Sequence, residues 1–280
     1  MAVTSELVKQ LRDKTGAGMM DCKKALDETN GDMNLAIEVL RKKGAATAAK
    51  RADKEANEGI IVSKLSDDAK LGVMVEINCE TDFVARGEDF TGFAASVAKV
   101  AFEKKPASVD ELLSLPHPDG KTVGDALTAL TGKVGEKTAV RRVFVHAASA
   151  GFLEQYIHMG SKIGVTVEVT GEYSPAAKTL ARDIAMQIAA MSPIVVRREE
   201  VDQALVAKEL EIYRTQAKNE GKPDQIADKI ANGRLEKYYQ EVVLLEQSFI
   251  KDAGKAVKDL LPPNVTVKQF KRFQLGEAIN

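Results

Sequence analysis

Within residues 72–79 the branched apolar residues Val73, Val75 and Ile77 alternate with Met74, Glu76 and Asn78. A period of two is typical of a half-buried β-strand. The first five residues of this segment, Gly-Val-Met-Val-Glu, recur as Gly-Val-Thr-Val-Glu at positions 164–168. The pattern therefore predicts two similar strands in the middle of the chain.

The neighbours of these two strands also match. Each is preceded by another predicted strand, over residues 59–65 and 140–147, and followed by an alanine-rich amphipathic helix, over residues 90–101 and 176–191. Matched neighbours on both sides favour an internal duplication over a chance repeat. We therefore predict an α+β core of two related subdomains, each an antiparallel sheet with helices on one face.

The segment after the first strand carries the most informative side chains. Thr81 or Asp82 is expected to cap a following helix, because a short side-chain oxygen accepts hydrogen bonds from unpaired amides in the first turn. Phe83 then falls in that turn. Two interpretations stay open: Phe83 folds back into the core as a hydrophobic staple, or it is presented to a partner.

The first fifty residues have a helical period instead. Helices are predicted over residues 4–15, 19–28 and 32–44, with the last ending at Gly44, and three short helices fit a small bundle. Residues 45–58 follow as a helical or extended connector.

The turn at residues 16–20, Gly-Ala-Gly-Met-Met, resembles the glycine-and-methionine turn of ubiquitin-associated (UBA) helical domains. Such domains bind the surfaces of other proteins. Met19 and Met20 either fill the core of the bundle or contact a partner, and the sequence leaves both interpretations open.

Residues 199–241 predict an antiparallel helical hairpin. A break at residues 219–223 separates two amphipathic helices, and the first arm extends roughly 30 Å at 1.5 Å per residue. A narrow pair of helices has little interior, so we expect it to project or to pack on a partner. Residues 265–275 alternate again and predict a closing strand of the core sheet.

The chain has 280 residues, of which 40 are basic and 41 acidic, for a formal net charge of -1. This length predicts two or three modules. A near-neutral balance argues against direct nucleic-acid binding as the main role, because such binding depends on neutralising phosphates. The sequence lacks a signal peptide and any run of about 18 apolar residues, so we expect a cytoplasmic protein without membrane contact.

The sequence offers few groups for bond-making chemistry. Its three histidines stand apart from one another: His117, His146 and His158. No metal-spaced cluster, nucleophile motif or phosphate loop accompanies them, and the glycines of residues 124–135 are expected in turns. Cys22 and Cys79 lie in different predicted elements, so we expect two buried thiols and neither a disulfide nor a zinc site. We expect no enzymatic activity, no metal and no cofactor.

Three segments resemble signatures of the elongation factor Ts family: residues 11–12 with 15–26, residues 80–86, and residues 156–160 with 163–165. Smaller matches at residues 134–136 and 141–142 lie in the expected order, so the resemblance spans essentially the whole chain. It implies a guanine nucleotide exchange factor for elongation factor Tu, the GTPase that delivers aminoacyl-tRNA to the ribosome. It also implies a UBA-like three-helix module, a two-part α+β core and an inserted antiparallel helical hairpin.

The resemblance implies roles for individual residues. Four residues would enter the GTPase and disturb its magnesium site: Thr81, Asp82, Phe83 and Val84. Nine others would contact elongation factor Tu: Arg12, Met19, Met20, Lys23, Arg51, Val134, Gly135, His158 and Gly160. Some relatives carry a further terminal helix beyond the closing strand, whereas this sequence stops at Asn280. We expect the contact of that helix to be absent or replaced.

We expect five regions along the chain. They are a UBA-like module with its connector, the first core subdomain, the second core subdomain, the hairpin and a return to the second subdomain: 1–55, 56–139, 140–198, 199–241 and 242–280. Two other functions stay open when the resemblance is set aside. One is an adaptor that recruits one partner through the helical module and another through the hairpin. The other is an RNA-binding accessory that uses basic faces at residues 41–51 and 268–272.

Overall fold

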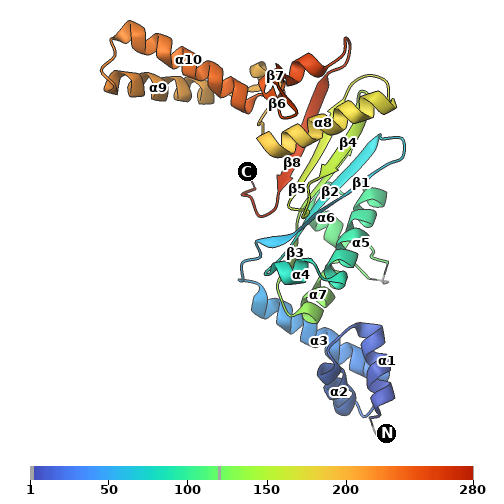
Figure 1. Ribbon diagram of the computed structural model, residues 1–280. Helices are drawn as coiled ribbons and strands as arrows, with labels where there is room; N and C mark the ends of the chain where they lie inside the picture. The colour runs from blue at the N-terminus through green and yellow to red at the C-terminus, as the bar shows by residue number, and fades with distance from the viewer. Residues whose placement is uncertain (1–2, 119–120, 280) are drawn as a thin grey trace.

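Three parts follow one another along an elongated molecule: a helical module at the N-terminal end, a core of two sheets, and a helical hairpin that projects at the opposite end (Figure 1). This is a computed structural model, and it describes residues 3–118 and 121–279. Helices and antiparallel sheets are mixed as the sequence predicts, so the α+β fold class is confirmed.

The N-terminal module contains three helices: α1 (Ser5–Thr15), α2 (Met19–Glu28) and α3 (Met33–Arg51). The side chains of Thr4 and Asp32 accept hydrogen bonds from the first turns of α1 and α3, which is why these helices begin there. Six buried residues form the core of the module: Val8, Leu11, Cys22, Ala25, Leu26 and Ala36. The module therefore has an apolar interior of its own.

The first half of the core contains one sheet in the order β1-β2-β3. Its strands are all antiparallel: β1 (Glu58–Leu65), β2 (Leu71–Cys79) and β3 (Thr138–Ala147). Four helices follow β2 in the chain: α4 (Asp82–Ala85), α5 (Glu88–Lys104), α6 (Val109–Ser114) and α7 (Val123–Val134). The apolar face of α5 buries Phe90, Ala94 and Val97 against β2, so one face of the sheet is covered by helices.

The second half repeats this arrangement. Its sheet has the order β4-β5-β8, again antiparallel: β4 (Phe152–Ile157), β5 (Ile163–Val169) and β8 (Val267–Gln274). Helix α8 (Pro175–Met191) follows β5 and packs on β4 and β5 as α5 packs on β1 and β2. Both halves therefore run strand, strand, helix and closing strand, which confirms the duplication.

The structure corrects the expected partner of one strand. Residues 140–147 belong to β3, which completes the first sheet, and the strand before the second repeat is β4. Alternation identifies a strand but not its neighbour, which is set by non-local pairing. We therefore propose that the two subdomains divide between β3 and β4 and not at 139/140.

A second correction concerns glycines. Helix α3 does not end at Gly44 but continues to Arg51, so residues 45–51 of the expected connector are helical. Gly124 and Gly132 lie inside α7 and not in turns. A Cβ on Gly132 would lie 2.6 Å from the Cα of Gly44. Gly44 and Gly132 therefore let α3 and α7 pack closely, and this contact fixes the N-terminal module to the core.

The hairpin consists of α9 (Gln203–Asn219) and α10 (Asp224–Val242), and it extends away from the sheets (Figure 1). Small buried side chains lie between its helices: Ala217, Ala227 and Ala231. Short 3-10 turns and a two-stranded sheet complete this end: η1 (Arg198–Glu200), η2 (Leu244–Glu246), β6 (Ser248–Phe249), β7 (Asp252–Ala256) and η3 (Val257–Leu260). The chain then forms β8, and no helix follows it up to residue 279.

Across residues 3–118 and 121–279, no helix combines the length and the apolar character that crossing a membrane requires.

Candidate functional site

Phe83, in the first turn of α4, is 85% exposed. Thr81 begins the helix, since its Oγ accepts a hydrogen bond from the Val84 N–H at 3.3 Å. Asp82 instead pairs with Arg86, one turn further along, at 2.8 Å. Ala85 is buried in the core of the first half, so α4 is anchored on one side and carries Phe83 on the other. Of the two caps expected, Thr81 is the one present, and the interpretation of Phe83 as a core residue is wrong.

Two glutamates hold the segment that precedes α4. The carboxylate of Glu136 accepts hydrogen bonds from the Thr81 N–H at 3.0 Å and from the Thr81 hydroxyl at 2.8 Å. The carboxylate of Glu80 accepts one from the Lys137 N–H at 2.6 Å and two from the Arg51 guanidinium at 3.1 and 2.8 Å. Neither glutamate could be assigned this role from local sequence patterns, because these bonds join residues far apart in the chain. Arg51, expected at a partner interface, is bound within the chain and keeps 38% of its side chain exposed.

Lys133 connects the N-terminal module with the start of α5. Its ammonium group pairs with Asp89 at 2.6 Å. The turn at Gly16 lies directly against this lysine, because a Cβ on Gly16 would clash with the end of the Lys133 side chain. The structure thus brings the glycine-methionine turn, the end of α7 and the start of α5 to the same end of the core. This lysine was missed from the sequence, where a single charged residue on a helix carries no distinguishing signal.

Met19 and Met20 begin α2 and are 47% and 64% exposed. They therefore lie outside the core of the module, and the interpretation that they fill it is wrong. Arg12 and Lys23 are also exposed. All four side chains are accessible to a partner.

Val134 and Gly135 lie at the end of α7, immediately before Glu136. Gly135 has a φ of 73° and ends the helix in the left-handed conformation that glycine adopts without strain. Val134 is half-buried against the core of the first half. The structure therefore joins this turn to α4 through Glu136.

His158 and Gly160 lie in the turn between β4 and β5, in the second half of the core. The ring Nδ1 of His158 is 2.8 Å from the Tyr156 hydroxyl, and Gly160 has a φ of 87°. Met159, between them, is 90% exposed. Among the described residues the hydrogen bonds of this turn run to its own hairpin, to β1 and to Leu275 after β8, and none joins His158 to α4. The turn is a second exposed surface, and no described hydrogen bond connects its His158 to α4.

Burial and neighbouring groups shift the pKa values of two titratable side chains, Cys79 and Glu168. Burial and the nearby Glu136 carboxylate raise the pKa of Cys79 to about 12, and Cys79 and Cys22 are both fully buried, as expected. Burial opposes the ionisation of Glu168, but hydrogen bonds from Gln269, His146 and two backbone amides outweigh it and hold its pKa at about 2. In the part of the chain that the structure covers, no three acidic, histidine or cysteine side chains gather as a metal site would require.

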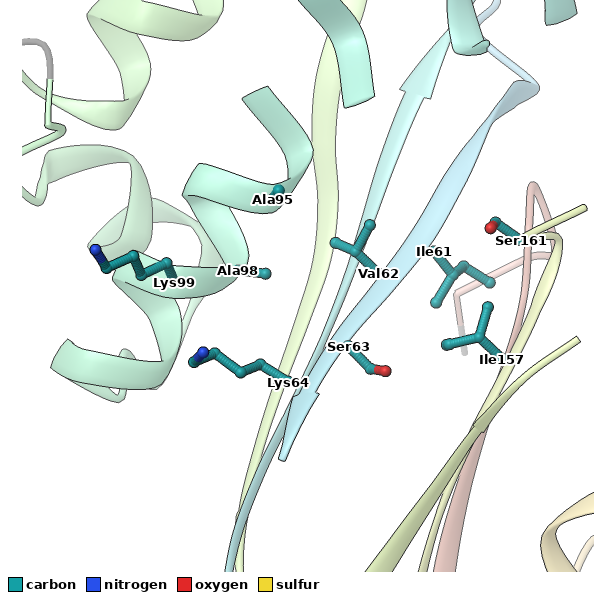
Figure 2. A pocket seen from close by; sticks show the side chains of 9 residues that line it. All are labelled: Ile61, Val62, Ser63, Lys64, Ala95, Ala98, Lys99, Ile157 and Ser161. Carbon is teal, nitrogen blue, oxygen red and sulfur yellow. The ribbon is translucent and has the colours of Figure 1, made fainter. Parts of the chain in front are cut away.

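An open groove of about 500 Å³ lies between β1, α5 and the turn after β4 (Figure 2). Ile61 and Ile157 face one another on one side of β1, while Val62 and Lys64 are directed to α5 on the other. The polar side chains of its lining are two serines and two lysines: Ser63, Ser161, Lys64 and Lys99. The lining of the groove therefore combines apolar side chains with hydroxyl and ammonium groups.

Comparisons with known proteins define the family. The family model described as Elongation factor TS matches residues 80–277. Elongation factor Ts from Chlorobium luteolum is 53% identical over 285 aligned residues, which cover 98% of this chain and 99% of the relative. Elongation factor Ts from Prosthecochloris aestuarii and from Chlorobaculum tepidum are each 52% identical, with the same coverage.

These matches identify the protein as a translation elongation factor. Its two-sheet core carries the exposed helix α4 at one end and the projecting hairpin at the other (Figure 1). The chain belongs to the elongation factor Ts family, whose members are nucleotide exchange factors.

Proposed function

We propose that this protein binds GDP-bound elongation factor Tu and accelerates release of GDP, so that GTP can bind. The observation that carries the proposal is Phe83, an 85% exposed aromatic on a capped helix that is fixed at both ends. Aromatic side chains that fill a pocket of a partner are typical hot spots of an interface. Burial of such a side chain is worth about 1.5 to 3 kcal/mol.

In the proposed mechanism, GDP is released because elements around the magnesium site of the GTPase are displaced. GTPases hold the phosphates of GDP by backbone amides and a magnesium ion, and magnesium requires near-octahedral oxygen ligands at about 2.0 to 2.1 Å. Insertion of the Phe83 ring between elements that flank this site displaces them, and a small displacement disrupts that geometry. Magnesium leaves, and the nucleotide loses its main counter-charge. We assign this step to the segment around Phe83: Thr81, Asp82, Phe83 and Val84.

Binding of the exchange factor and binding of nucleotide are then negatively coupled. Linkage requires the weakening to be reciprocal, so an incoming nucleotide also displaces the factor. The protein changes the rate of exchange without choosing between GDP and GTP. Direction comes from the cellular nucleotide concentrations and from removal of the GTP form.

The other residues supply affinity in this account. We propose that the exposed residues of the module, the turn after α7 and the turn after β4 contact elongation factor Tu: Arg12, Met19, Met20, Lys23, Arg51, Val134, Gly135, His158 and Gly160. These positions lie on different elements, so they fix the orientation in which α4 meets the GTPase. The activity makes and breaks no bond and needs neither cofactor nor nucleic acid. It takes place in the cytoplasm, where translation occurs.

The test is release of a fluorescent GDP analogue from purified elongation factor Tu, followed in excess unlabelled GDP. We expect release to accelerate with increasing concentration of this protein until it reaches a plateau. We also expect the affinity for the GTPase to fall as GDP rises. Binding with no change in the release rate would contradict the proposal and favour an adaptor.

A further inference from the structure

We propose that Glu136 is a positioning residue for exchange, which holds Thr81 so that α4 presents Phe83 in one orientation. The inference rests on the proposed function and adds a residue that lies outside the segment assigned to the magnesium site. Glu136 is half-buried and is 55 residues from Thr81 in the chain.

The bonds of Glu136 begin where the sheet stops. The ladder between β2 and β3 ends with Cys79 opposite Thr138. If the ladder continued, Glu80 would lie opposite Lys137 and the two residues would be joined by backbone hydrogen bonds. Instead the Glu80 carboxylate accepts the Lys137 N–H, and the Glu136 carboxylate accepts the Thr81 N–H. The two segments therefore hold each other through reciprocal side-chain to backbone hydrogen bonds.

This exchange of partners frees the backbone after Glu80 to turn away from the sheet. Thr81 then has an extended conformation, with a φ of -125° and a ψ of 153°, and α4 starts at the next residue. Hydrogen bonds to a carboxylate are stronger than those between neutral groups. Glu136 makes two of them to Thr81, at 3.0 and 2.8 Å, so it fixes both the backbone and the side chain of the capping residue.

Helix α4 needs such support because it has only four residues, and a helix of this length is unstable alone. Ala85 anchors its far end by burial in the core. Thr81 is itself exposed, so hydrogen bonds and not packing hold it: Glu136 accepts from its N–H and hydroxyl, and its carbonyl accepts one from the Cys79 thiol at 3.1 Å. With Thr81 released, Phe83 would sample many orientations, and its ring would lie against the magnesium site in a smaller fraction of the complexes formed.

Glu136 is a cleaner test of this idea than Glu80. The Glu80 carboxylate also binds Arg51, so its replacement would disturb the N-terminal module as well. Within the described residues, the hydrogen bonds of the Glu136 side chain go to Thr81 alone. A matched control is Glu111, whose carboxylate likewise accepts a backbone N–H, from Ala107 at 2.7 Å, in the loop before α6.

The experiment compares Glu136→Ala, Glu136→Gln and Glu111→Ala with the wild-type protein in the release of fluorescent GDP from elongation factor Tu. We expect Glu136→Ala to lower the plateau rate about tenfold, since a misplacement of about 1 Å can cost up to a hundredfold. The half-saturating concentration should change little, because the other contacts remain. Glu136→Gln should recover part of the rate, since its amide oxygen still accepts one bond. Glu111→Ala should behave as wild type.

Hydrogen exchange of the Thr81 amide provides a readout that needs no GTPase. We expect faster exchange at Thr81 in Glu136→Ala, with an unchanged melting temperature. An unchanged plateau in this variant, together with faster exchange, would overturn the positioning role. An equal loss in Glu111→Ala would overturn it too, because any removed carboxylate would then suffice. Failure of the wild-type protein to accelerate release would instead overturn the proposed function, and the positioning role with it.

Discussion

Glu76 and Glu168 occupy equivalent positions in the two sheets, and both carboxylates are buried where the ladder to the closing strand shifts register. Glu76 accepts the Gly276 N–H at 3.0 Å, in the turn after β8. Glu168 accepts the Ser149 and Ala150 N–H groups, each at 2.8 Å, in the turn after β3. Each glutamate thus binds the segment that ends the other sheet. The duplicated halves are coupled through a reciprocal pair of buried carboxylates.

This arrangement predicts how stability depends on pH. The pKa of Glu168 is held at about 2 in the folded protein, below its ordinary value of 4.5, by hydrogen bonds that outweigh burial. A depressed pKa means that the stabilisation is present above about pH 4.5 and is lost as pH falls towards 2. The shift corresponds to about 3 kcal/mol. Glu168→Gln should lower the free energy of unfolding at pH 7 and flatten its dependence on pH between these limits.

Chemical denaturation of both proteins at several pH values measures this effect. Lys251→Ala, which removes an exposed ion pair with Asp183 at 2.7 Å, serves as the control and should change stability by less than about 1 kcal/mol. Parallel pH profiles for Glu168→Gln and the wild-type protein would refute the assigned role of this carboxylate.

The exposure of Met20 predicts a loss of affinity without a loss of fold. Met20→Asp places a charge at a position that is 64% exposed, so the melting temperature should stay within the range of surface substitutions, about 0.5 kcal/mol in stability. If the module binds elongation factor Tu through this face, the half-saturating concentration should rise about tenfold or more. The plateau rate of release should stay close to wild type. The same titration on Leu35→Asp, at a 49% exposed position of α3, tests whether any charge on the module has this effect.

The hairpin predicts a different separation of rate and affinity. Its contact lies far from the nucleotide if the arm reaches a partner, so it stabilises all complexes equally and cannot itself distort the magnesium site. Uniform binding lowers the concentration needed without raising the maximal rate. Replacing residues 207–233 by a short Gly/Ser linker should raise the half-saturating concentration and leave the plateau nearly unchanged. This cut keeps the pair of Arg198 with Glu236 at 2.8 Å and the buried Leu235, which join the base of the hairpin.

The cost of the replacement itself is modest, because closure entropy grows only logarithmically with loop length. Circular dichroism should show a loss of helix limited to the removed arm. A collapsed plateau with unchanged half-saturation would mean that the arm acts on release, which would reverse this division of roles.

Local patterns predicted most elements of the fold. The alternation at residues 72–79 and the five-residue repeat located β2 and β5, and Asp32 marked the start of α3. The strand β4 was not predicted, because it is buried on both faces: Phe152 and Glu154 lie under α8, while Leu153 and Gln155 meet the first sheet. Buried faces on both sides remove the alternation on which a strand prediction depends.

The candidate site was predicted only in part for a related reason. Thr81 and Phe83 stand together in the sequence, so local rules predicted a cap at Thr81 or Asp82, but they left open whether Phe83 is buried or exposed. The support of Thr81 comes from elsewhere, from Glu136 in the turn between α7 and β3, and Lys133 at the end of α7 binds Asp89 at the start of α5. The packing of Gly44 on Gly132 is equally non-local, and a glycine near the end of a helical pattern is read as a stop signal by default.

The central claim is that the exposed ring of Phe83 drives release, and Phe83→Ala tests it most directly. Stopped-flow release of fluorescent GDP from elongation factor Tu gives the plateau rate, with Phe102→Ala, a half-buried aromatic of α5, for comparison. If the 1.5 to 3 kcal/mol of burial acts at the release step, the plateau should fall roughly ten- to a hundredfold in Phe83→Ala. Its melting temperature should be unchanged, because the ring is 85% exposed. A large fall in melting temperature with an undiminished plateau would contradict the account.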